Sequence, residues 1–342
     1  MKRVTMQDIA QKAGVTKATV SMVINNDKRI TNATRQKVLE IIRELNYYPN
    51  ESARKLAKGR ADAIAFMVPR FGPFFISVIF DAFENLAFQK EKFTQGILPY
   101  PTRNQTSILE ELLKKILYGR KADAVVVLTQ KPSETMVREY VDNRVPMVLI
   151  ENEMKGVHSV KVDNVAGAYE ATLSLIQKGR KNIGLIAGEI ETNPAWGLNQ
   201  PAVERIEGFK KALKEKGMRF DEGKSASVVT YDYEEGKACA RQLLEKNPKL
   251  DSIFCAAGDI VAMGAMEFLK TKGYRVPQDV AVVGYDDMVA SRMLSPALTT
   301  VRQPFSEIAS LAFGMALDSI EGNLREEKHI LLKPELILRE ST

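Results

Sequence analysis

The hydrophobic positions at the start of the chain predict two short helices joined by a very tight turn. The first helix spans 5–13, where the apolar residues share one face at helical spacing, and Gly14 ends it. The second helix begins at Thr16, and Val20 and Val23 lie on its inner face. Two short helices arranged in this way are typical of a helix-turn-helix, whose second helix enters the major groove of DNA.

Two further helical patterns complete this N-terminal segment. Thr31 begins a third helix with apolar residues at helical spacing, and Pro49 follows its end. Residues 50–58 form a short fourth pattern that is marginal in water alone, so we expect it to order only with DNA and a second subunit. We therefore predict a helix-turn-helix domain over 1–46 and a hinge helix over 47–60.

From residue 61 onward the pattern changes to short apolar runs that alternate with helical stretches. The runs predict strands over 63–68, 123–128, 146–150, 182–188, 227–230, 252–257 and 279–287. Helical stretches between them include 104–118, 164–178, 203–216, 234–246 and 259–272. Continuously apolar strands separated by helices indicate parallel sheets that are covered on both faces.

The strand–helix pattern restarts near Asp163, and 61–342 is long for one doubly wound sheet. We therefore expect an N-terminal all-α helix-turn-helix domain followed by an α/β core of two doubly wound, parallel-sheet lobes. Ligands of such sheets bind outside the carboxyl ends of the strands, and two lobes can present these ends to each other across a cleft.

Charge is concentrated at one end of the chain. Residues 1–60 contain 13 Lys and Arg against 5 Asp and Glu, a net charge of +8, whereas the whole chain carries +6, which leaves −2 for 61–342. A basic excess confined to the predicted helix-turn-helix is typical of a module that binds a polyanion. A solvated basic surface is the alternative, and charge alone does not decide between the two.

Several classes of function find no support in the sequence. No apolar run approaches the ~20 residues that span a bilayer, and the N-terminus lacks the apolar stretch of a signal peptide, so we expect a cytoplasmic protein with no membrane partner. Cys239 and Cys255 are expected to be buried free thiols, and His158 and His329 show no metal-ligand spacing. No phosphate-loop, dinucleotide or nucleophile-elbow motif occurs. We expect no metal, no cofactor and no enzymatic activity.

The N-terminal residues resemble the lactose/galactose repressor (LacI/GalR) family of bacterial transcriptional regulators. The resemblance rests on the run Ala-Thr-Val-Ser, on Asn-Tyr-x-Pro-Asn and on Ala-Arg-x-Leu within 18–56. It implies a homodimer on pseudopalindromic double-stranded operator DNA, where Leu56 wedges between base steps of the minor groove, Ala53 permits close approach and Asn50 contacts the groove. The DNA-binding residues that it implies are Thr5, Thr16, Lys17, Ala18, Thr19, Ser21, Met22, Asn25, Asn50, Ala53 and Leu56.

Within this set Lys17 and Ala18 match base-reading positions, whereas Thr5, Thr19 and Ser21 match phosphate contacts. Met22 departs from the family, whose members usually carry Arg there. Arg reads guanine with two hydrogen bonds that Met cannot make. Either the operator differs at that base or Lys17 supplies the readout, so the usual family operator is not assumed.

The resemblance extends more loosely through the core. The matching motifs cover 160–164, 204–209, 258–265, 276–287 and 294–304. They imply a core like that of periplasmic binding proteins, in which the chain crosses between the lobes three times. They also imply a small-molecule effector in the cleft, which we expect to be a carbohydrate. The lobes that follow are an N-lobe of about 61–162 and 291–323 and a C-lobe of about 163–290 and 324–342.

Matched residue by residue, Arg205 and Asp286 are the main candidates for effector contacts. The alternatives are a surface ion pair of Arg205 with Glu204 or Glu207, and a helix N-cap for Asp286. Tyr231 matches an aromatic residue that stacks on a ligand ring, although an ordinary tyrosine at a strand end is the alternative. Further candidates are Phe74, Glu151, Trp196, Asp259, Gln303 and Phe305.

Two departures bear on the identity of the effector. Gly258 stands where sugar-responsive members commonly carry Asn, so one hydroxyl contact is expected to be missing. The segment 189–203 is longer than the usual loop and holds Trp196, which either stacks on a sugar or packs the loop.

The sequence favours a DNA-binding transcriptional repressor whose operator affinity depends on a sugar or sugar derivative bound between the lobes. Effector binding is expected to change the angle between the lobes and so the spacing of the hinge helices. The alternatives are a two-lobed solute-binding protein and a sugar- or nucleotide-processing enzyme. The sequence leaves open the effector, the operator, induction against corepression, and dimer against tetramer.

Overall fold

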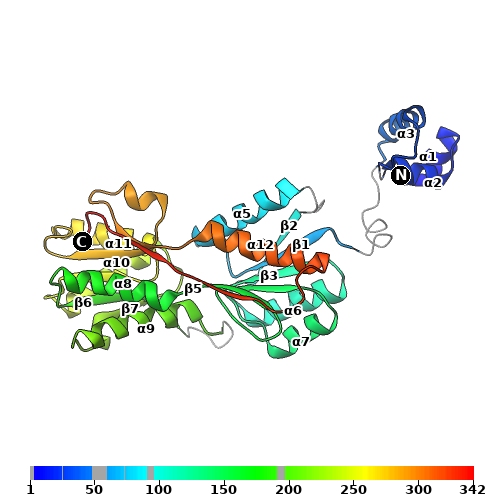
Figure 1. Cartoon of the computed structure of the whole chain (residues 1–342). Helices are drawn as coiled ribbons and strands as arrows, with labels where there is room; N and C mark the ends of the chain where they lie inside the picture. Colours follow the sequence, from blue (N-terminus) through cyan, green and yellow to red (C-terminus); the bar gives the residue numbers. More distant parts are fainter. Residues whose placement is uncertain (1–3, 25, 48–59, 73, 91–95, 191–196) are drawn as a thin grey trace. The chain divides into compact units, whose positions relative to one another are not determined.

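The computed structural model describes residues 4–24, 26–47, 60–72, 74–90, 96–190 and 197–342. The chain forms two compact units, Met1–Arg60 and Ala61–Thr342, and each is described by itself (Figure 1).

The N-terminal unit contains three helices, α1 (Met6–Ala13), α2 (Lys17–Ile24) and α3 (Asn32–Glu44), in its described residues. A capping box begins α1, since the Thr5 side chain accepts from the Asp8 amide and the Thr5 amide donates to the Asp8 carboxylate. Gly14 ends α1 in the left-handed region at φ 64°. The three helices share one buried core, which contains Ile9, Ala10, Ala13, Val20, Val23, Val38, Ile41 and Tyr47.

The predicted two-lobed α/β fold of the second unit is confirmed by two six-stranded sheets in its described part. The N-lobe sheet has the order β11-β5-β4-β3-β1-β2 and contains β1 (Ala63–Val68), β2 (Gly96–Pro101), β3 (Ala124–Leu128), β4 (Met147–Ile150), β5 (His158–Val162) and β11 (His329–Leu332). The C-lobe sheet has the order β12-β10-β9-β8-β6-β7 and contains β6 (Ile183–Gly188), β7 (Ser225–Val228), β8 (Ser252–Cys255), β9 (Ala281–Asp286), β10 (Thr299–Arg302) and β12 (Glu335–Ile337). Neighbouring strands are parallel except for β10 and β12.

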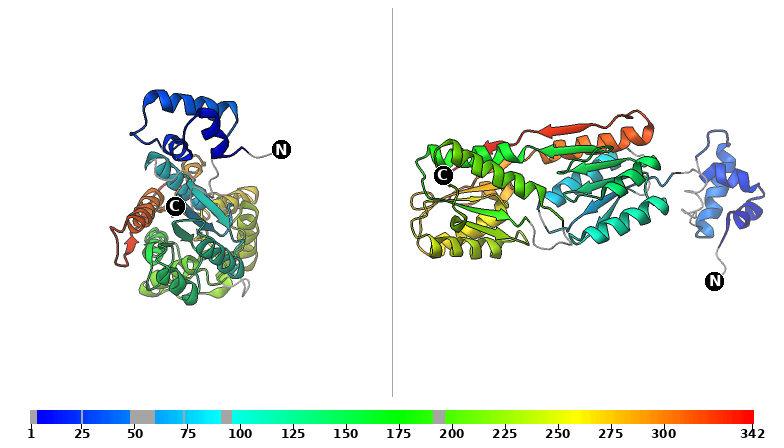
Figure 2. Two further views of the ribbon diagram at one scale, coloured as in Figure 1. Left: turned by 90° about the vertical axis from the view of Figure 1, so that its right-hand side faces the viewer. Right: turned by 90° about the horizontal axis from the view of Figure 1, so that it is seen from below.

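Helices cover both faces of each sheet, as Figures 1 and 2 show. On the N-lobe, α5 (Phe74–Lys90) and α12 (Phe305–Glu321) pack on one face, and α6 (Thr106–Tyr118) and α7 (Glu134–Asp142) pack on the other. On the C-lobe, α10 (Tyr233–Lys246) and α11 (Asp259–Thr271) face α8 (Asn164–Gln177) and α9 (Gln200–Glu215) across the sheet. Every residue of β1 is buried because both of its faces are covered, which explains its continuously apolar sequence.

Two of the three predicted crossings between the lobes are wrong. The first crossing falls at Asp163, between β5 and α8. The chain returns to the N-lobe at 303–304 rather than at 291, because β10 pairs with β9 in the C-lobe sheet. It crosses again at 333–334 rather than at 324, because β11 pairs with β5 in the N-lobe sheet (Figure 2).

The strand predicted over 227–230 is also displaced, since β7 ends at Val228. The amides of Val229, Thr230 and Tyr231 donate to the carboxylate of Glu235 instead of to a neighbouring strand. This carboxylate on α10 turns the chain away from the sheet and places Tyr231 at its edge.

Cys239 and Cys255 are buried free thiols, as predicted. In the part of the chain that the structure describes, no helix is long and apolar enough to span a membrane.

Candidate effector pocket and DNA-binding surface

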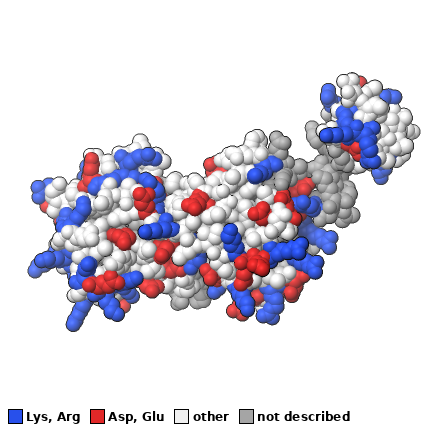
Figure 3. All heavy atoms as spheres, viewed as in Figure 1, with Lys and Arg blue, Asp and Glu red and all other residues white. Residues whose placement is uncertain are grey.

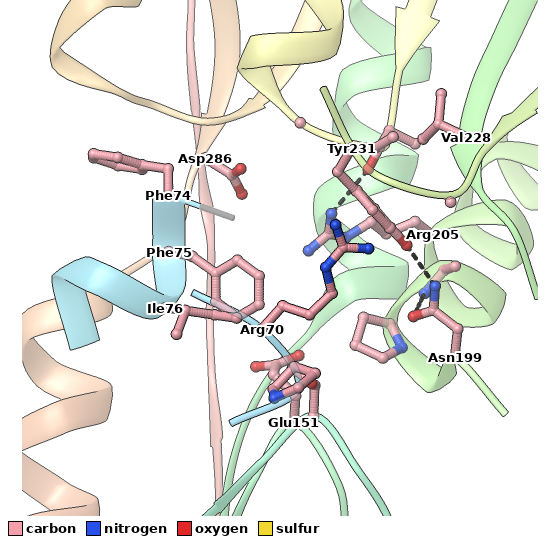
Figure 4. A pocket seen from close by; sticks show the side chains of 18 of the residues that line it. Arg70, Phe74, Phe75, Ile76, Glu151, Asn199, Arg205, Val228, Tyr231 and Asp286 are labelled. Atoms are coloured by element: carbon pink, nitrogen blue, oxygen red, sulfur yellow. Dashed lines mark hydrogen bonds between the residues drawn. The ribbon is translucent and has the colours of Figure 1, made fainter. Parts of the chain in front are cut away.

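A pocket of about 160 Å³ lies between the two lobes at the carboxyl ends of the parallel strands. One water molecule needs roughly 10–15 Å³ of cavity volume. The pocket is therefore large enough to hold a small-molecule ligand. Residues just past β1, β3, β4, β7, β8 and β9 contribute to its wall, which places the pocket where ligands of doubly wound sheets bind (Figure 4).

Arg205 projects from α9 into this pocket and is held in place by the protein (Figure 4). Its Nε donates to Asn164 Oδ1 at 2.9 Å and its Nη1 donates to the carbonyl of Ala256 at 2.8 Å. The guanidinium lies 3.8 Å from the ring centroid of Tyr285. The predicted alternative, an ion pair with Glu204 or Glu207, is therefore not what positions Arg205. A guanidinium fixed at Nε and Nη1 still has N–H groups for a ligand.

Asp286 lies at the end of β9 with an unusual backbone at φ 113°. Its Oδ1 accepts from Gln303 Nε2 at 2.6 Å, so Asp286 is not the helix N-cap of the alternative interpretation. Burial raises the pKa of this carboxyl to about 7, although the nearby Arg205 opposes the shift. Gly258 adjoins Asp286, because a Cβ built on Gly258 would lie 3.0 Å from Asp286 Oδ2.

Glu151 lines the N-lobe side of the pocket, directly after β4, at φ 65°. Its two carboxylate oxygens accept from the Val162 amide at 2.9 Å and from Asn164 Nδ2 at 2.7 Å. Burial raises the pKa of Glu151, while these hydrogen bonds and Arg205 act in the opposite direction. The polar wall of the pocket is thus built from groups of both lobes.

Aromatic side chains form a second, apolar wall. Phe74 and Phe75 come from the start of α5, and Phe305 begins α12. The rings of Phe75 and Phe305 stack at a centroid distance of 6.4 Å and an interplanar angle of 22°. A wall of this kind suits the apolar face of a ligand whose edge carries polar groups.

Tyr231 is partly buried against the C-lobe side of the pocket. Its hydroxyl accepts from Asn199 Nδ2 at 2.5 Å, and the same Asn199 amide donates to the carbonyl of Glu189 at 3.0 Å. The ring packs directly on Gly188, where a Cβ would lie 1.9 Å from the Tyr231 hydroxyl oxygen. Gly188 at the end of β6 therefore leaves the space that Tyr231 occupies.

The structure brings most of the predicted effector residues to this one pocket. Those that line it are Phe74, Glu151, Arg205, Tyr231, Asp286, Gln303 and Phe305. Trp196 lies outside the described residues.

Asp259 is the predicted effector residue that the structure places elsewhere. Its carboxylate is fully buried and accepts from the hydroxyls of Ser291 and Thr300 and from the amide of Met288. Burial raises its pKa to about 6 against these hydrogen bonds. Asp259 therefore ties the segment after β9 to α11 behind the pocket wall and does not line the pocket.

Asn199 and Gln130 line the pocket but were not predicted. Asn199 caps α9 just before Pro201, so its sequence context indicates only the start of a helix. Gln130 is buried after β3; its Oε1 accepts from the Thr102 hydroxyl, and its Nε2 has no partner among the described residues. Its position past a strand end is the signal that could have identified it.

The second candidate site is the exposed surface of α2 in the N-terminal unit. Lys17 and Ala18 are exposed in its first turn, and the half-buried Thr19, Ser21 and Met22 follow. The hydroxyl of Thr16 accepts from the Thr19 amide at 3.1 Å and so caps this helix, as predicted. Charged groups on the visible face of this unit are mainly Lys and Arg (Figure 3). Asn25, Asn50, Ala53 and Leu56 lie outside the described residues.

Comparison with known proteins places both sites in one family. Residues 5–50 match the family model of the bacterial regulatory proteins of the lacI family, and 173–342 match the periplasmic binding protein-like domain. The chain is 33% identical to the HTH-type transcriptional regulator CelR of Thermobifida fusca, with 99% of this chain and 98% of that protein covered. The chain belongs to the LacI family of bacterial transcriptional regulators.

Other members show the same extent of likeness. DegA of Bacillus subtilis, another HTH-type transcriptional regulator, is 31% identical over 99% of this chain and 98% of its own length. A solved complex of the regulator CelR with cellobiose is 30% identical, covers 99% of this chain and 100% of that chain, and has a TM-score of 0.71. The lac repressor dimer bound to operator has a TM-score of 0.85 at 24% identity, covers 99% of each chain and has the same fold. The LacI-family chain described here thus joins a DNA-binding unit to a ligand-binding-type core.

Proposed function

We propose that this LacI-family regulator is a cytoplasmic, homodimeric repressor that binds a pseudopalindromic operator and responds to a sugar in the interlobe pocket. The observation that carries the proposal is that Arg205 and Asp286 line the same pocket as the aromatic rings of Phe74, Phe75 and Phe305. Charged groups that accept and donate hydrogen bonds suit vicinal hydroxyls, and aromatic rings suit the C–H face of a pyranose. The relative CelR, solved with cellobiose, supports a β-linked disaccharide as the first effector to test.

The proposed role is binding without turnover. In the pocket, Glu151, Asp286 and Arg205 form hydrogen bonds with side-chain amides and the backbone. No described group of His, Cys, Asp and Glu could hold a metal. The relatives are transcriptional regulators, which supports a regulatory role for the pocket.

A thermal-shift series with cellobiose, glucose, ribose and adenine tests the effector class. A ligand at about 100 times its Kd adds roughly 2.7 kcal/mol to the free energy of unfolding, which raises the Tm of a core of this size by about 5 °C. We expect cellobiose or another sugar to produce this shift. The proposal would be contradicted if adenine alone stabilised the protein. It would also be contradicted if no sugar in a wider carbohydrate panel raised the Tm.

Operator binding is expected to depend steeply on salt. With DNA selected from a random pool, affinity should fall roughly 10³-fold to 10⁵-fold between about 50 and 200 mM salt if 6–10 phosphates are contacted. Lys17→Ala should cost ~1–3 kcal/mol on the selected site, because Lys17 is exposed in the first turn of α2 and is proposed to read a base. Fluorescence anisotropy measures both effects, and Lys214→Ala, an exposed lysine of α9 in the core, is the matched control. Equal losses for Lys17→Ala on selected and unrelated DNA would contradict base reading.

The affinity for the effector is expected to rise about tenfold from pH 6 to pH 8. Asp286 has a pKa of about 7 in the free protein, above its ordinary value of 3.8, and a sugar hydroxyl donates to the ionised carboxylate. Binding therefore selects the ionised form and releases a proton below pH 7. The same raised pKa lowers the free energy of unfolding as pH rises from 3.8 through 7, since the unfolded chain ionises first.

Isothermal titration in two buffers of different ionisation enthalpy measures this proton release. Asp286→Asn should flatten the pH profile, whereas Glu245→Gln, an exposed carboxylate on α10, should leave it unchanged. If the effector affinity of Asp286→Asn still rises steeply with pH, a group other than Asp286 must titrate.

A further inference from the structure

One buried amide joins polar groups of both lobes behind the pocket. Asn164 begins α8 immediately after the first crossing and is fully buried. Its Nδ2 donates to Glu151 Oε2 in the N-lobe at 2.7 Å and to Glu204 Oε2 in the C-lobe at 3.3 Å. Its Oδ1 accepts from Arg205 Nε at 2.9 Å and from the Tyr285 hydroxyl at 3.2 Å. Both ends of this side chain are therefore used, and a charged group of each lobe depends on it.

An ion pair crosses the junction beside this amide. Lys161 Nζ in β5 of the N-lobe lies 2.9 Å from Glu204 Oε1 in α9 of the C-lobe. The two side chains are 19% and 13% exposed, and Gln200 Nε2 also donates to Glu204 Oε1 at 3.1 Å. Glu204 precedes Arg205 on the same helix, so movement of either residue affects the other.

This pair differs from the ion pairs on the surface of the core. Lys115 and Glu111 pair within α6, where their side chains are 57% and 62% exposed, and such a pair contributes little to stability. Removing one partner of a largely buried pair instead leaves a charge in a poorly solvated place. Lys161 and Glu204 also belong to different lobes, so their contact depends on the angle between the lobes.

We propose that Asn164 and the Lys161–Glu204 pair form an interlobe latch, which positions Arg205 and couples the occupied pocket to one arrangement of the lobes. The inference rests on the proposed function, in which Arg205 contacts the effector. Arg205 is already held by Asn164 and Ala256 in the latched arrangement, so a ligand meets a guanidinium that is in place. The ligand therefore binds this arrangement more tightly than an unlatched one and shifts the population toward it. By linkage, the latch also sets how strongly the effector changes operator affinity.

The distance between the lobes tests the latch without any ligand. Spin labels at Lys121→Cys in the N-lobe and Lys214→Cys in the C-lobe occupy exposed positions, while the native Cys239 and Cys255 are buried. Pulsed electron paramagnetic resonance on full-length chains measures the distance between the two labels. Dilution with unlabelled protein ensures that both labels belong to one chain. We expect one narrow distribution in the parent chain and a second peak or clear broadening in Lys161→Met and Asn164→Ala. Lys115→Met is the matched control and should keep the narrow distribution.

A double-mutant cycle with cellobiose as the probe tests the coupling to Arg205. Lys161→Met and Glu204→Gln should each weaken cellobiose binding by about tenfold, and the double variant should be no weaker than either single one. Lys161→Arg retains the charge pair and should restore affinity. A role in stability alone would lower the Tm of these variants without changing the interlobe distance.

The outcomes separate the latch from the proposed function. Variants that keep the parent's narrow distance distribution overturn the latch, whether or not a sugar binds. A broadened distribution in a protein that binds no sugar supports the latch and overturns the proposed effector class. Additive losses in the cycle would show that Lys161 and Glu204 act independently, which also overturns the latch.

Discussion

Replacing Arg205 with Ala is expected to weaken effector binding by at least about 100-fold. Hydrogen bonds to a charged group contribute ~1.5–3 kcal/mol each, and the guanidinium has free N–H groups for more than one. The loss has a second part, because Arg205 lowers the pKa of Asp286 and its removal favours the neutral carboxyl. Isothermal titration with the best-binding sugar measures the change at pH 8, where the parent Asp286 is mostly ionised.

Two variants separate ligand contact from support of the fold. Arg205→Lys keeps the charge but cannot supply the planar fork of donors, so we expect it to restore only a small part of the affinity. Arg241→Ala removes an arginine from α10, where the guanidinium lies over Phe268, and should leave binding unchanged. An Arg205→Ala protein with parental affinity and a parental Tm would show that the effector does not contact this residue.

The N-terminal unit was predictable because its signals are local. The capping box of Thr5 with Asp8, the left-handed Gly14 and the cap at Thr16 each lie within a few residues of the helix end that they define. The apolar spacing that places Ile9 in the core is likewise set within one helix. The role of Lys17, in contrast, was inferred from the family resemblance and not from these local signals.

The lobe crossings were harder to predict because strand pairing is not local. β10 is the sequence Thr-Thr-Val-Arg, and its membership of the C-lobe depends on hydrogen bonds with β9. β11 reaches the N-lobe only through pairing with β5, far earlier in the chain. Neither strand is a continuous apolar run, so the pattern that located β1 and β9 did not apply to them.

Most of the pocket-lining residues could be predicted, but the sequence did not show which side chains face the ligand. Matching to family positions, and not strand ends alone, selected Glu151, Tyr231 and Asp286, and all three line the one pocket. The same reasoning placed Asp259 there, yet its three donors lie behind the wall, and no local pattern distinguishes a carboxylate that faces a ligand from one that faces the protein. Asn199 was missed because its sequence context indicates only a helix cap and gives no sign of its contact with Tyr231.

Replacing Ile9 with Ala is expected to abolish operator binding while effector binding stays intact. Ile9 is fully buried among the helices of the N-terminal unit, and such a substitution costs ~2–5 kcal/mol. A unit of this size is stabilised by only about 3–5 kcal/mol, so most molecules should lose the folded helix-turn-helix at 37 °C. The core forms its own compact unit with separate apolar clusters and should keep its Tm.

Measuring both ligands on one preparation makes this prediction decisive. Anisotropy with operator DNA should show no specific binding by Ile9→Ala, and titration with the sugar should show the parental affinity. Gln36→Ala, an exposed change on α3, is the control for both measurements. Arg205→Ala should give the opposite pattern, because its core lacks the ligand contact while α2 can still enter the groove. Loss of both functions in either variant would mean that the two units depend on each other for folding, which their separate cores argue against.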